Sequence, residues 1–273
     1  MKKLFLFVVI VVVIGLWGVS SLNAQTVTAT VNVGGLPISV GVNAMTNKIY
    51  VANLQDDTVS VIDGATDTVT ATVNVGGYPI SVGVNATTNK IYVANEADET
   101  VSVIDGATDT VTATVNVGDQ PFGVGVNATT NKIYVVNWND NTVSVIDGAT
   151  DTVTATVNVG GGPWGVGVNA TTNKIYVANS ADETVSVIDG ATDTVTATVN
   201  VGNGPISVGV NATTNKIYVA NFTDETVSVI EDAPSPAPTT PVPTLNEWGL
   251  IILSLLMIGI GYITIRRRNS ASV

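Results

Sequence analysis

Cysteine and histidine are both absent from the 273 residues of this chain. Without them the chain cannot build a Ser-His-Asp triad, a cysteine nucleophile, a disulfide, or a metal site with imidazole or thiolate ligands. Charge is scarce as well: 12% of the residues are charged, and 22 acidic against 10 basic residues give a formal net charge of -12. Nucleic-acid binding needs a basic footprint, so we expect no nucleic-acid partner.

The first 24 residues have the layout of a secretory signal peptide. Two lysines precede an apolar run over residues 4–17, which is short for a bilayer span but typical of a signal-peptide core. We expect cleavage after Ala24, with cleavage after Ser21 as an alternative. An uncleaved membrane anchor is the other interpretation. In each case the residues that follow are exported.

The other end of the chain has three successive parts. Residues 234–243 are rich in proline and are expected to form an extended linker. A short polar motif follows, and residues 248–265 then form an apolar segment. As a helix at about 1.5 Å per residue it would be roughly 27 Å long, just enough for the hydrocarbon core of a membrane. The arginines at residues 266–268 are expected to stay on the cytoplasmic side.

This tail resembles the IPTL-CTERM type of bacterial C-terminal sorting signal, which shares its layout with PEP-CTERM tails. The word VPTLNEWG at residues 242–249, the apolar segment and the arginine cluster carry the resemblance. It implies a Gram-negative host and a membrane sorting enzyme that recognises and cleaves residues 244–273 and delivers the protein to the cell surface or extracellular matrix. A plain stop-transfer anchor is the alternative. The resemblance assigns the sorting signal to Pro243, Thr244, Leu245, Glu247, Trp248, Arg266, Arg267 and Arg268.

Residues 25–233, between these two ends, consist of five copies of one unit. The word TVTATVNV begins every 42 residues, at Thr26, Thr68, Thr110, Thr152 and Thr194. Each unit predicts four short strands, A to D, which in the first copy cover residues 38–43, 48–53, 58–63 and 68–75. Val, Ile, Thr and Tyr dominate these runs, and Gly, Asn and Asp separate them. Four strands in a repeat of about 40 residues are typical of a β-propeller blade.

We therefore predict an all-β fold, a β-propeller of five four-stranded blades. The repeats resemble the YVTN family of propellers through the words KIYVAN and TVSVID and the NVG-x-x-P turn. The chain begins with a D strand at residues 26–33 that has no A, B and C before it, and residues 206–231 supply A, B and C with no D after them. We expect the first strand to complete the last blade and close the ring. An open ring, or one completed by oligomerisation, is the alternative.

The copies differ mainly in the D–A connections and in the B–C loops. In an up-and-down blade these loops emerge on one face, and loops on a rigid scaffold concentrate binding residues. Large apolar and aromatic side chains there suit sugar rings or apolar ligands. The candidate binding residues are Leu36, Tyr78, Phe122, Trp138, Trp164 and Phe222.

An alternative interpretation makes two of these rings part of a packed layer. Phe122 and Trp164 are each followed by Gly, whereas Ile at the same repeat position is followed by Ser. This exchange suggests that volume is conserved, and it favours partial burial of both rings near the central channel. Trp138 and Phe222 are the better candidates for exposure.

Other chemistry has little support in the sequence. The Asp pair in each DGATD turn suits calcium, but Asp is also an ordinary turn former, and we expect neither a metal nor a cofactor. No carboxylate pair has the apolar setting of an acid/base dyad, so we name no catalytic residue.

We therefore expect an exported surface or biofilm-matrix propeller that acts as a binding or adhesion module towards a surface polysaccharide or another surface protein. A passive structural component of the envelope or matrix is the alternative. We expect that the protein is not an enzyme, because lyase-like and dehydrogenase-like propellers rely on His or on cofactors.

Overall fold

The computed structural model describes residues 25–232, in which every regular element is a β-strand. The strands form four antiparallel sheets of four strands and a fifth sheet of three, each in chain order. In chain order the strands are β1 (Pro37–Asn43), β2 (Lys48–Asn53), β3 (Thr58–Asp63), β4 (Thr68–Asn74), β5 (Pro79–Asn85), β6 (Lys90–Asn95), β7 (Thr100–Asp105), β8 (Thr110–Asn116), β9 (Pro121–Asn127), β10 (Lys132–Asn137), β11 (Thr142–Asp147), β12 (Thr152–Asn158), β13 (Pro163–Asn169), β14 (Lys174–Asn179), β15 (Thr184–Asp189), β16 (Thr194–Asn200), β17 (Pro205–Asn211), β18 (Lys216–Asn221) and β19 (Thr226–Glu231).

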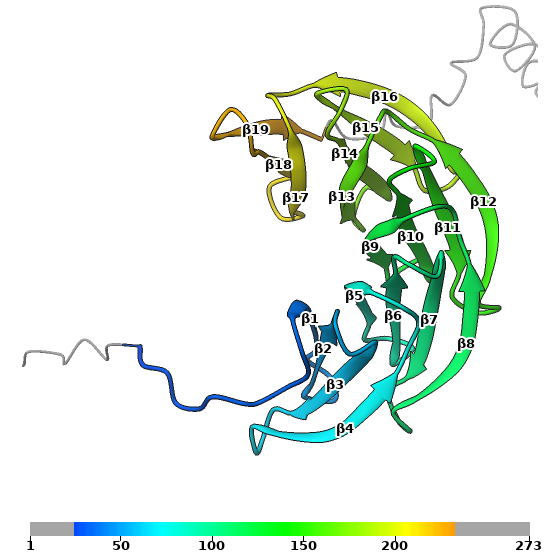
Figure 1. The fold of residues 1–273 in the computed structure, drawn as a ribbon. Coiled ribbons are helices and arrows are strands. Elements are labelled where there is room, and N and C mark those ends of the chain that lie inside the picture. Colours follow the sequence, from blue (N-terminus) through cyan, green and yellow to red (C-terminus); the bar gives the residue numbers. More distant parts are fainter. Residues whose placement is uncertain (1–24, 233–273) are drawn as a thin grey trace, which may run out of the picture.

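The sheets are arranged as the blades of a propeller. Each sheet runs outward from a common axis, with its first strand innermost and its last strand outermost (Figure 1). The innermost strands of consecutive blades pack together, β1 against β5, β5 against β9, β9 against β13 and β13 against β17. The predicted four-strand units are confirmed, with strand bounds that agree to about one residue.

The core is divided among the spaces between consecutive blades. Between the first two, Tyr50, Val59 and Val61 of blade 1 are fully buried against Ile91 and Val93 of blade 2. Equivalent clusters fill the three following spaces. Burial of one such side chain contributes about 1.5–3 kcal/mol, so every blade stabilises its neighbours mainly through these faces.

Polar contacts repeat at each step from blade to blade as well. Lys48 Nζ lies 2.8 Å from the carboxylate of Asp109 in the next blade. The side-chain amide of Asn43 donates to Asn89 Oδ1 at 2.8 Å. The same two kinds of contact recur in the next two steps. The first three steps therefore share one set of polar contacts.

A glycine in each inner strand lets consecutive blades approach closely. A Cβ atom placed on Gly41 would lie 2.7 Å from Val82 Cγ1, which is closer than real Cβ contacts come. The Gly of PISVGVN is thus required by packing between blades rather than by a turn.

The predicted closure of the ring is wrong. Residues 26–33 form no strand, and they lead away from blade 1 into solvent (Figure 1). β19 is the edge of a three-stranded sheet, and the arc stays open between blade 5 and blade 1. An extended segment becomes a strand only beside a partner that satisfies its backbone groups. The contacts between consecutive blades set the curvature of the arc, and five blades do not bring β19 back to the beginning of the chain.

The predicted signal peptide, linker and apolar tail lie outside the described residues. Within residues 25–232, no helix has the length and apolar character needed to cross a membrane.

Candidate functional site

In each blade, recurring hydrogen bonds join the two variable loops, the D–A connection and the B–C loop. These hydrogen bonds are called the loop clamp below. In blade 1 the amide of Gly35 donates to Asp56 Oδ2 at 2.7 Å, and the amide of Leu54 donates to the carbonyl of Leu36 at 3.0 Å. The D–A connection and the B–C loop therefore lie side by side. The same amide-to-carboxylate bond recurs in the other blades as Gly77–Asp98, Asp119–Asp140, Gly161–Asp182 and Asn203–Asp224.

Hydrogen bonds to the backbone account for the recurring carboxylates. Besides the loop clamps, Asp63 Oδ1 accepts from the amide of Ala65 at 2.7 Å, which caps the C–D turn. In the described part of the chain, no group of three or more acidic side chains is placed to hold a metal ion. These aspartates act as turn and loop formers.

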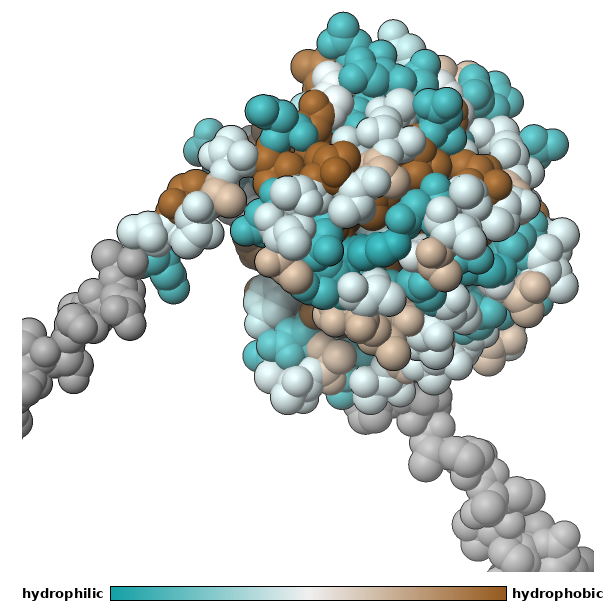
Figure 2. All heavy atoms as spheres, turned by 90° about the horizontal axis from the view of Figure 1, so that it is seen from below, coloured by the Kyte–Doolittle hydropathy of each residue, from teal (hydrophilic) through white to brown (hydrophobic). Residues whose placement is uncertain are grey.

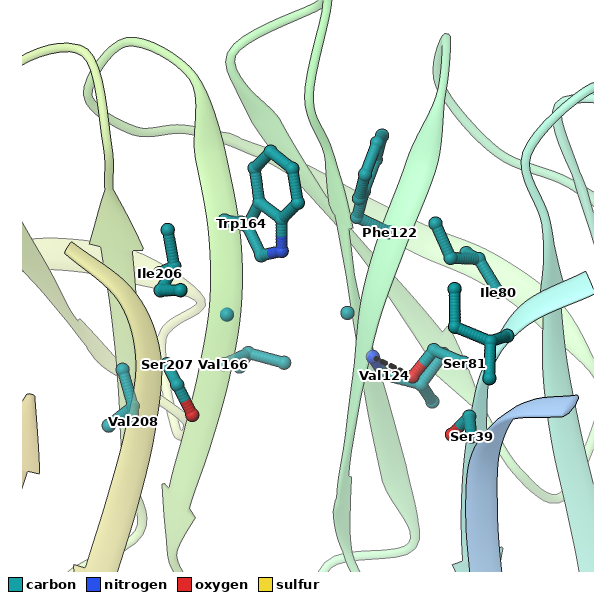
Figure 3. A pocket seen from close by; sticks show the side chains of 13 residues that line it. Ser39, Ile80, Ser81, Phe122, Val124, Trp164, Val166, Ile206, Ser207 and Val208 are labelled. Carbon is teal, nitrogen blue, oxygen red and sulfur yellow. Dashed lines mark hydrogen bonds between the residues drawn. The ribbon is translucent and has the colours of Figure 1, made fainter. Parts of the chain in front are cut away.

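A cavity of about 500 Å³ lies on the axis, where the inner strands of all five blades converge. Phe122 and Trp164 stand at one end of it, and Ser39 and Ser207 lie toward the other (Figure 3). Ser81 Oγ accepts a hydrogen bond from the amide of Val124 at 3.3 Å. The side chains in the wall are apolar or hydroxylic, so the cavity offers hydroxyl and aromatic contacts without a charged group.

Three of the predicted binding residues form an aromatic cluster beside this cavity. The ring centroids of Phe122 and Trp164 are 4.8 Å apart, and those of Phe122 and Trp138 are 6.3 Å apart, with tilted planes in both cases. Trp138 is 38% exposed and Trp164 41% exposed, while Phe122 is partly buried between them. The two indoles, from neighbouring blades, are thus exposed to solvent and both contact the ring of Phe122. Trp164 is more exposed than the packed-layer interpretation expects.

The glycines that follow Phe122 and Trp164 are explained by contacts with the next blade, and not by the conserved side-chain volume that the sequence suggested. A Cβ atom on Gly165 would lie 2.6 Å from the carbonyl oxygen of Ile206 in the next blade. Pairing of β13 with β14 lapses between Pro163 and Val166, whereas the Ile-Ser copies resume pairing at the Ser. The Gly therefore permits close approach of two backbones at a widened bulge, and the bulge leaves the indole outside the ladder.

The remaining predicted binding residues are exposed but stand apart from this cluster. Leu36 and Tyr78 have φ angles of 51° and 54° at the repeat position that Gly162 and Gly204 occupy in blades 4 and 5. Phe222, on blade 5, is 73% exposed. We assign these three side chains no shared site.

Asp232 is a buried residue that sequence reasoning missed. Its carboxylate accepts hydrogen bonds from Lys174 Nζ at 2.6 Å and from Asn169 Nδ2 at 2.9 Å, and also from the hydroxyl of Thr172. Burial by itself would raise the pKa of Asp232, but hydrogen bonds from Lys174, Thr172 and Tyr176 outweigh it and lower that pKa. The available signal was the last copy itself, which reads Glu-Asp-Ala where the others read Asp-Gly-Ala.

Buried tyrosines lie between the blades and remain protonated at neutral pH. Burial, supported by the carboxylates of Asp109 and Asp105, raises the pKa of Tyr50 to about 12. Burial also raises the pKa values of Tyr92, Tyr134 and Tyr176. Among the described residues, the hydroxyl groups of Tyr50, Tyr92 and Tyr134 are buried without a hydrogen-bond partner, whereas that of Tyr176 donates to Asp232.

Radial antiparallel blades around an axial cavity define a β-propeller, and the tail adds a sorting signal. The IPTL-CTERM motif matches residues 240–268, which marks an exported, envelope-associated protein and implies processing by a membrane sorting enzyme. The glutamine cyclotransferase family matches residues 82–235, more than half of the chain. The chain belongs to the glutamine cyclotransferase family. No comparison names the YVTN family, and that resemblance stays a prediction.

A solved β-propeller domain supports the fold. The β-propeller domain of Cps50 (Swd1) from Myceliophteria thermophila is 13% identical, with 79% of this chain and 71% of that chain covered and a TM-score of 0.67. The hydrazine synthase of Kuenenia stuttgartiensis is 15% identical, with 78% of this chain and 100% of that chain covered and a TM-score of 0.45. At such identities the likeness concerns the fold alone. No curated protein matches the chain.

The family match overturns the expectation that this protein is not an enzyme. That expectation took the absence of His and Cys as evidence against catalysis. Carboxylates and tyrosines also transfer protons, so the composition excludes particular mechanisms and leaves others open.

Proposed function

We propose that this exported propeller binds a surface polysaccharide through the aromatic cluster of Phe122, Trp138 and Trp164. The observation that carries the proposal is the pair of indoles, about two-fifths exposed, held by a shared phenyl ring on the loop face. Exposed aromatics in a monomeric surface are uncommon and often mark a binding site.

The surroundings of the cluster suit a neutral sugar. An indole offers a flat apolar face to the C–H groups of a sugar ring, and the adjoining cavity supplies hydroxyl groups from Ser39, Ser81 and Ser207. Few precisely placed polar groups in an apolar cleft are the usual composition of a ligand site. The net charge of -12 disfavours an acidic polymer.

A glycan array with the full chain in detergent tests this proposal. We expect binding of a neutral polysaccharide that falls at least tenfold in Trp164→Ala and in Trp138→Ala. Phe222→Ala is the matched control, because Phe222 occupies the same repeat position as Trp138, is exposed, and lies two blades away. If no glycan on the array is bound, or if Trp164→Ala binds as well as the natural chain, the site is rejected and the passive structural role is favoured.

A second candidate function follows from the family. In cyclisation of an N-terminal glutamine, the α-amine attacks the side-chain amide carbon and ammonia leaves. A peptide with N-terminal glutamine should then lose ammonia when incubated with the chain, as read by mass spectrometry, and an N-acetylated peptide should not. Unchanged peptide would limit the family assignment to common descent.

Delivery to the cell surface of a Gram-negative host is also proposed, on the strength of the sorting motif at residues 240–268. The repeat words favour the YVTN type of propeller for the same chain. Immunogold labelling of intact cells against permeabilised cells tests the location.

A further inference from the structure

The last blade exposes a face that every other blade buries. Val227 is 59% and Val229 53% exposed, and Tyr218 is partly exposed beside them. Their counterparts in blade 1, Val59 and Tyr50, are fully buried against blade 2. The outward face of blade 5 is therefore one half of an interface between blades, without its other half.

The first blade exposes the complementary face. Val40 and Val42 are 62% and 60% exposed, although their counterparts Val82 and Val84 pack into the core between blades 1 and 2. Apolar side chains gather on the surface beside the point at which the N-terminal segment leaves the blades (Figure 2). Blade 1 thus presents the half that blade 5 lacks.

From these two faces we infer that the protein assembles head to tail, with blade 1 of a second copy docked on blade 5 of the first. In this joint, residues 26–33 of the second copy pair with β19 of the first and supply its missing fourth strand. The inference concerns the ends of the arc and does not depend on the proposed function.

The donor segment has the sequence of the strand it would replace. Residues 26–33 read TVTATVNV, as in β16 and the three other outer strands, yet they are unpaired, and Val27 is 86% exposed. Val185 of β15 faces Val199 of β16. The same register places Val31 of the donor opposite Val227 of β19. An unpaired edge strand is the usual acceptor in strand addition.

Polar groups at the two faces match in the same register. Lys48 pairs with Asp109 at the first step between blades. Counting by repeats, Lys216 of one copy would pair with Asp67 of the next. Lys216 is now 3.7 Å from the exposed Glu231 of its own blade, and Asp67 has no cationic partner among the described residues.

The space around the inner-strand glycine of blade 5 shows that its neighbouring blade is missing. A Cβ atom on Gly41 would clash with Val82, as described above, whereas a Cβ atom on Gly209 would meet nothing closer than the carbonyl of Tyr218 at 3.9 Å. Gly209 therefore leaves room for the inner strand of another blade to pack against β17, and the single chain has no blade at that place.

A second copy fits these faces better than closure within one chain. Closure within one chain would require the contacts between its blades to change, whereas docking of another copy leaves them as they are. The arc curves back toward its own beginning (Figure 1), so a series of joined copies avoids collision only if each joint also shifts the next copy along the axis, in a spiral. A contact between unlike faces propagates in this way.

Disulfide trapping tests the joint, since the natural chain has no cysteine. Full chains carrying Val31→Cys and Val227→Cys, with different tags, are mixed in detergent and oxidised. We expect a mixed disulfide dimer, with at least tenfold less of it when Thr30→Cys replaces Val31→Cys, because Thr30 faces the other side of the strand. Absence of the mixed dimer would overturn the inference.

The double variant with both cysteines in one chain separates the two occupants of the edge. A ladder of disulfide-linked oligomers supports assembly between copies. A monomer with an internal disulfide would show that the segment closes its own ring, and it would overturn the inference.

Gly209→Val provides an independent test without cysteines. The side chain meets open space in the single chain but would collide with Val40 and Val42 of a docked copy. We expect sedimentation of the full chain to show oligomers for the natural protein and at least a tenfold weaker association for Gly209→Val, at an unchanged circular dichroism spectrum. Lys216→Asp should also weaken association, and Asp67→Lys in the same chain should restore it. Equal association by all variants would contradict the joint.

Discussion

Lys174 and Asp232 form an ion pair between the last two blades, with Nζ and Oδ1 2.6 Å apart. At the three preceding steps the same lysine position pairs with the final Asp of the next DGATD turn. Blade 5 ends before such a turn, and Asp232 supplies the carboxylate directly after β19. The side chain of Asp232 has no exposure, so this pair is more buried than the others.

Replacement of Asp232 should destabilise the last blade. Asp232→Asn leaves Lys174 without its buried counter-charge, and we expect a loss of about 3 kcal/mol, as for broken buried pairs. Asp109→Asn is the matched control and should cost about 1 kcal/mol, since both partners of the Lys48–Asp109 pair are partly exposed. Hydrogen exchange of β17–β19 during urea titration measures both. Equal losses would contradict the special role of Asp232.

The same carboxylate should give the fold a dependence on acid pH. The pKa of Asp232 is lower in the folded chain than its ordinary value near 3.9, so the folded state favours the ionised form. Its contribution to stability is complete above that ordinary value and is lost as the pH falls through the lower folded value. Thermal unfolding between pH 6 and pH 2 should show this loss in the natural chain, with a flatter profile in Asp232→Asn. Parallel profiles would refute it.

Glycine substitutions should distinguish inner steps from the open end. Gly83→Ala places a Cβ atom 2.5 Å from Val124 Cγ1, and we expect a loss of about 2 kcal/mol from overpacking. Gly209→Ala makes the same chemical change where the nearest atom is 3.9 Å away, so the stability of the single chain should hardly change. Denaturant unfolding at low protein concentration compares the two, and similar losses would mean that the inner spacing is not fixed by glycine.

The repeat pattern predicted the strands well because each one is specified locally. Alternating Val and Thr, with Asn, Asp and Gly at the turns, set β1–β4 almost to the residue. The predicted pairing of the first strand with the last blade was wrong. TVTATVNV forms a strand in four places and is unpaired in the fifth. Whether these eight residues form a strand depends on a partner edge, and its position follows from the curvature of the whole arc.

The candidate site could be predicted only in part for a related reason. The loop face and Trp138 follow from comparing repeats. The contact of Phe122 with both tryptophans depends on the bulges at Gly123 and Gly165. Each of these glycines lies close to backbone atoms of the next blade. Contacts between blades are not visible in the sequence of one blade.

The asparagine that ends the second strand of every repeat should contribute to stability. Asn95 Nδ2 donates to Thr100 Oγ1 at 3.0 Å and to Ser102 Oγ at 2.9 Å in a fully buried site. Asn95→Ala removes both bonds and should cost about 2 kcal/mol. A double-mutant cycle with Ser102→Ala measures the coupling by thermal unfolding, and additive losses would show that the bond to Ser102 contributes nothing.

The arginine cluster at the end of the sorting motif should control processing. If Arg266–Arg268 hold the tail on the cytoplasmic side, changing all three to Ser should leave uncleaved protein in the inner membrane. Changing them to Lys keeps the charge, so processing in that variant would mean that charge suffices, whereas failure would mean that the sorting enzyme reads guanidinium groups. Immunoblots of membrane and surface fractions measure both forms. Unchanged surface delivery of the Ser variant would contradict a role for the cluster.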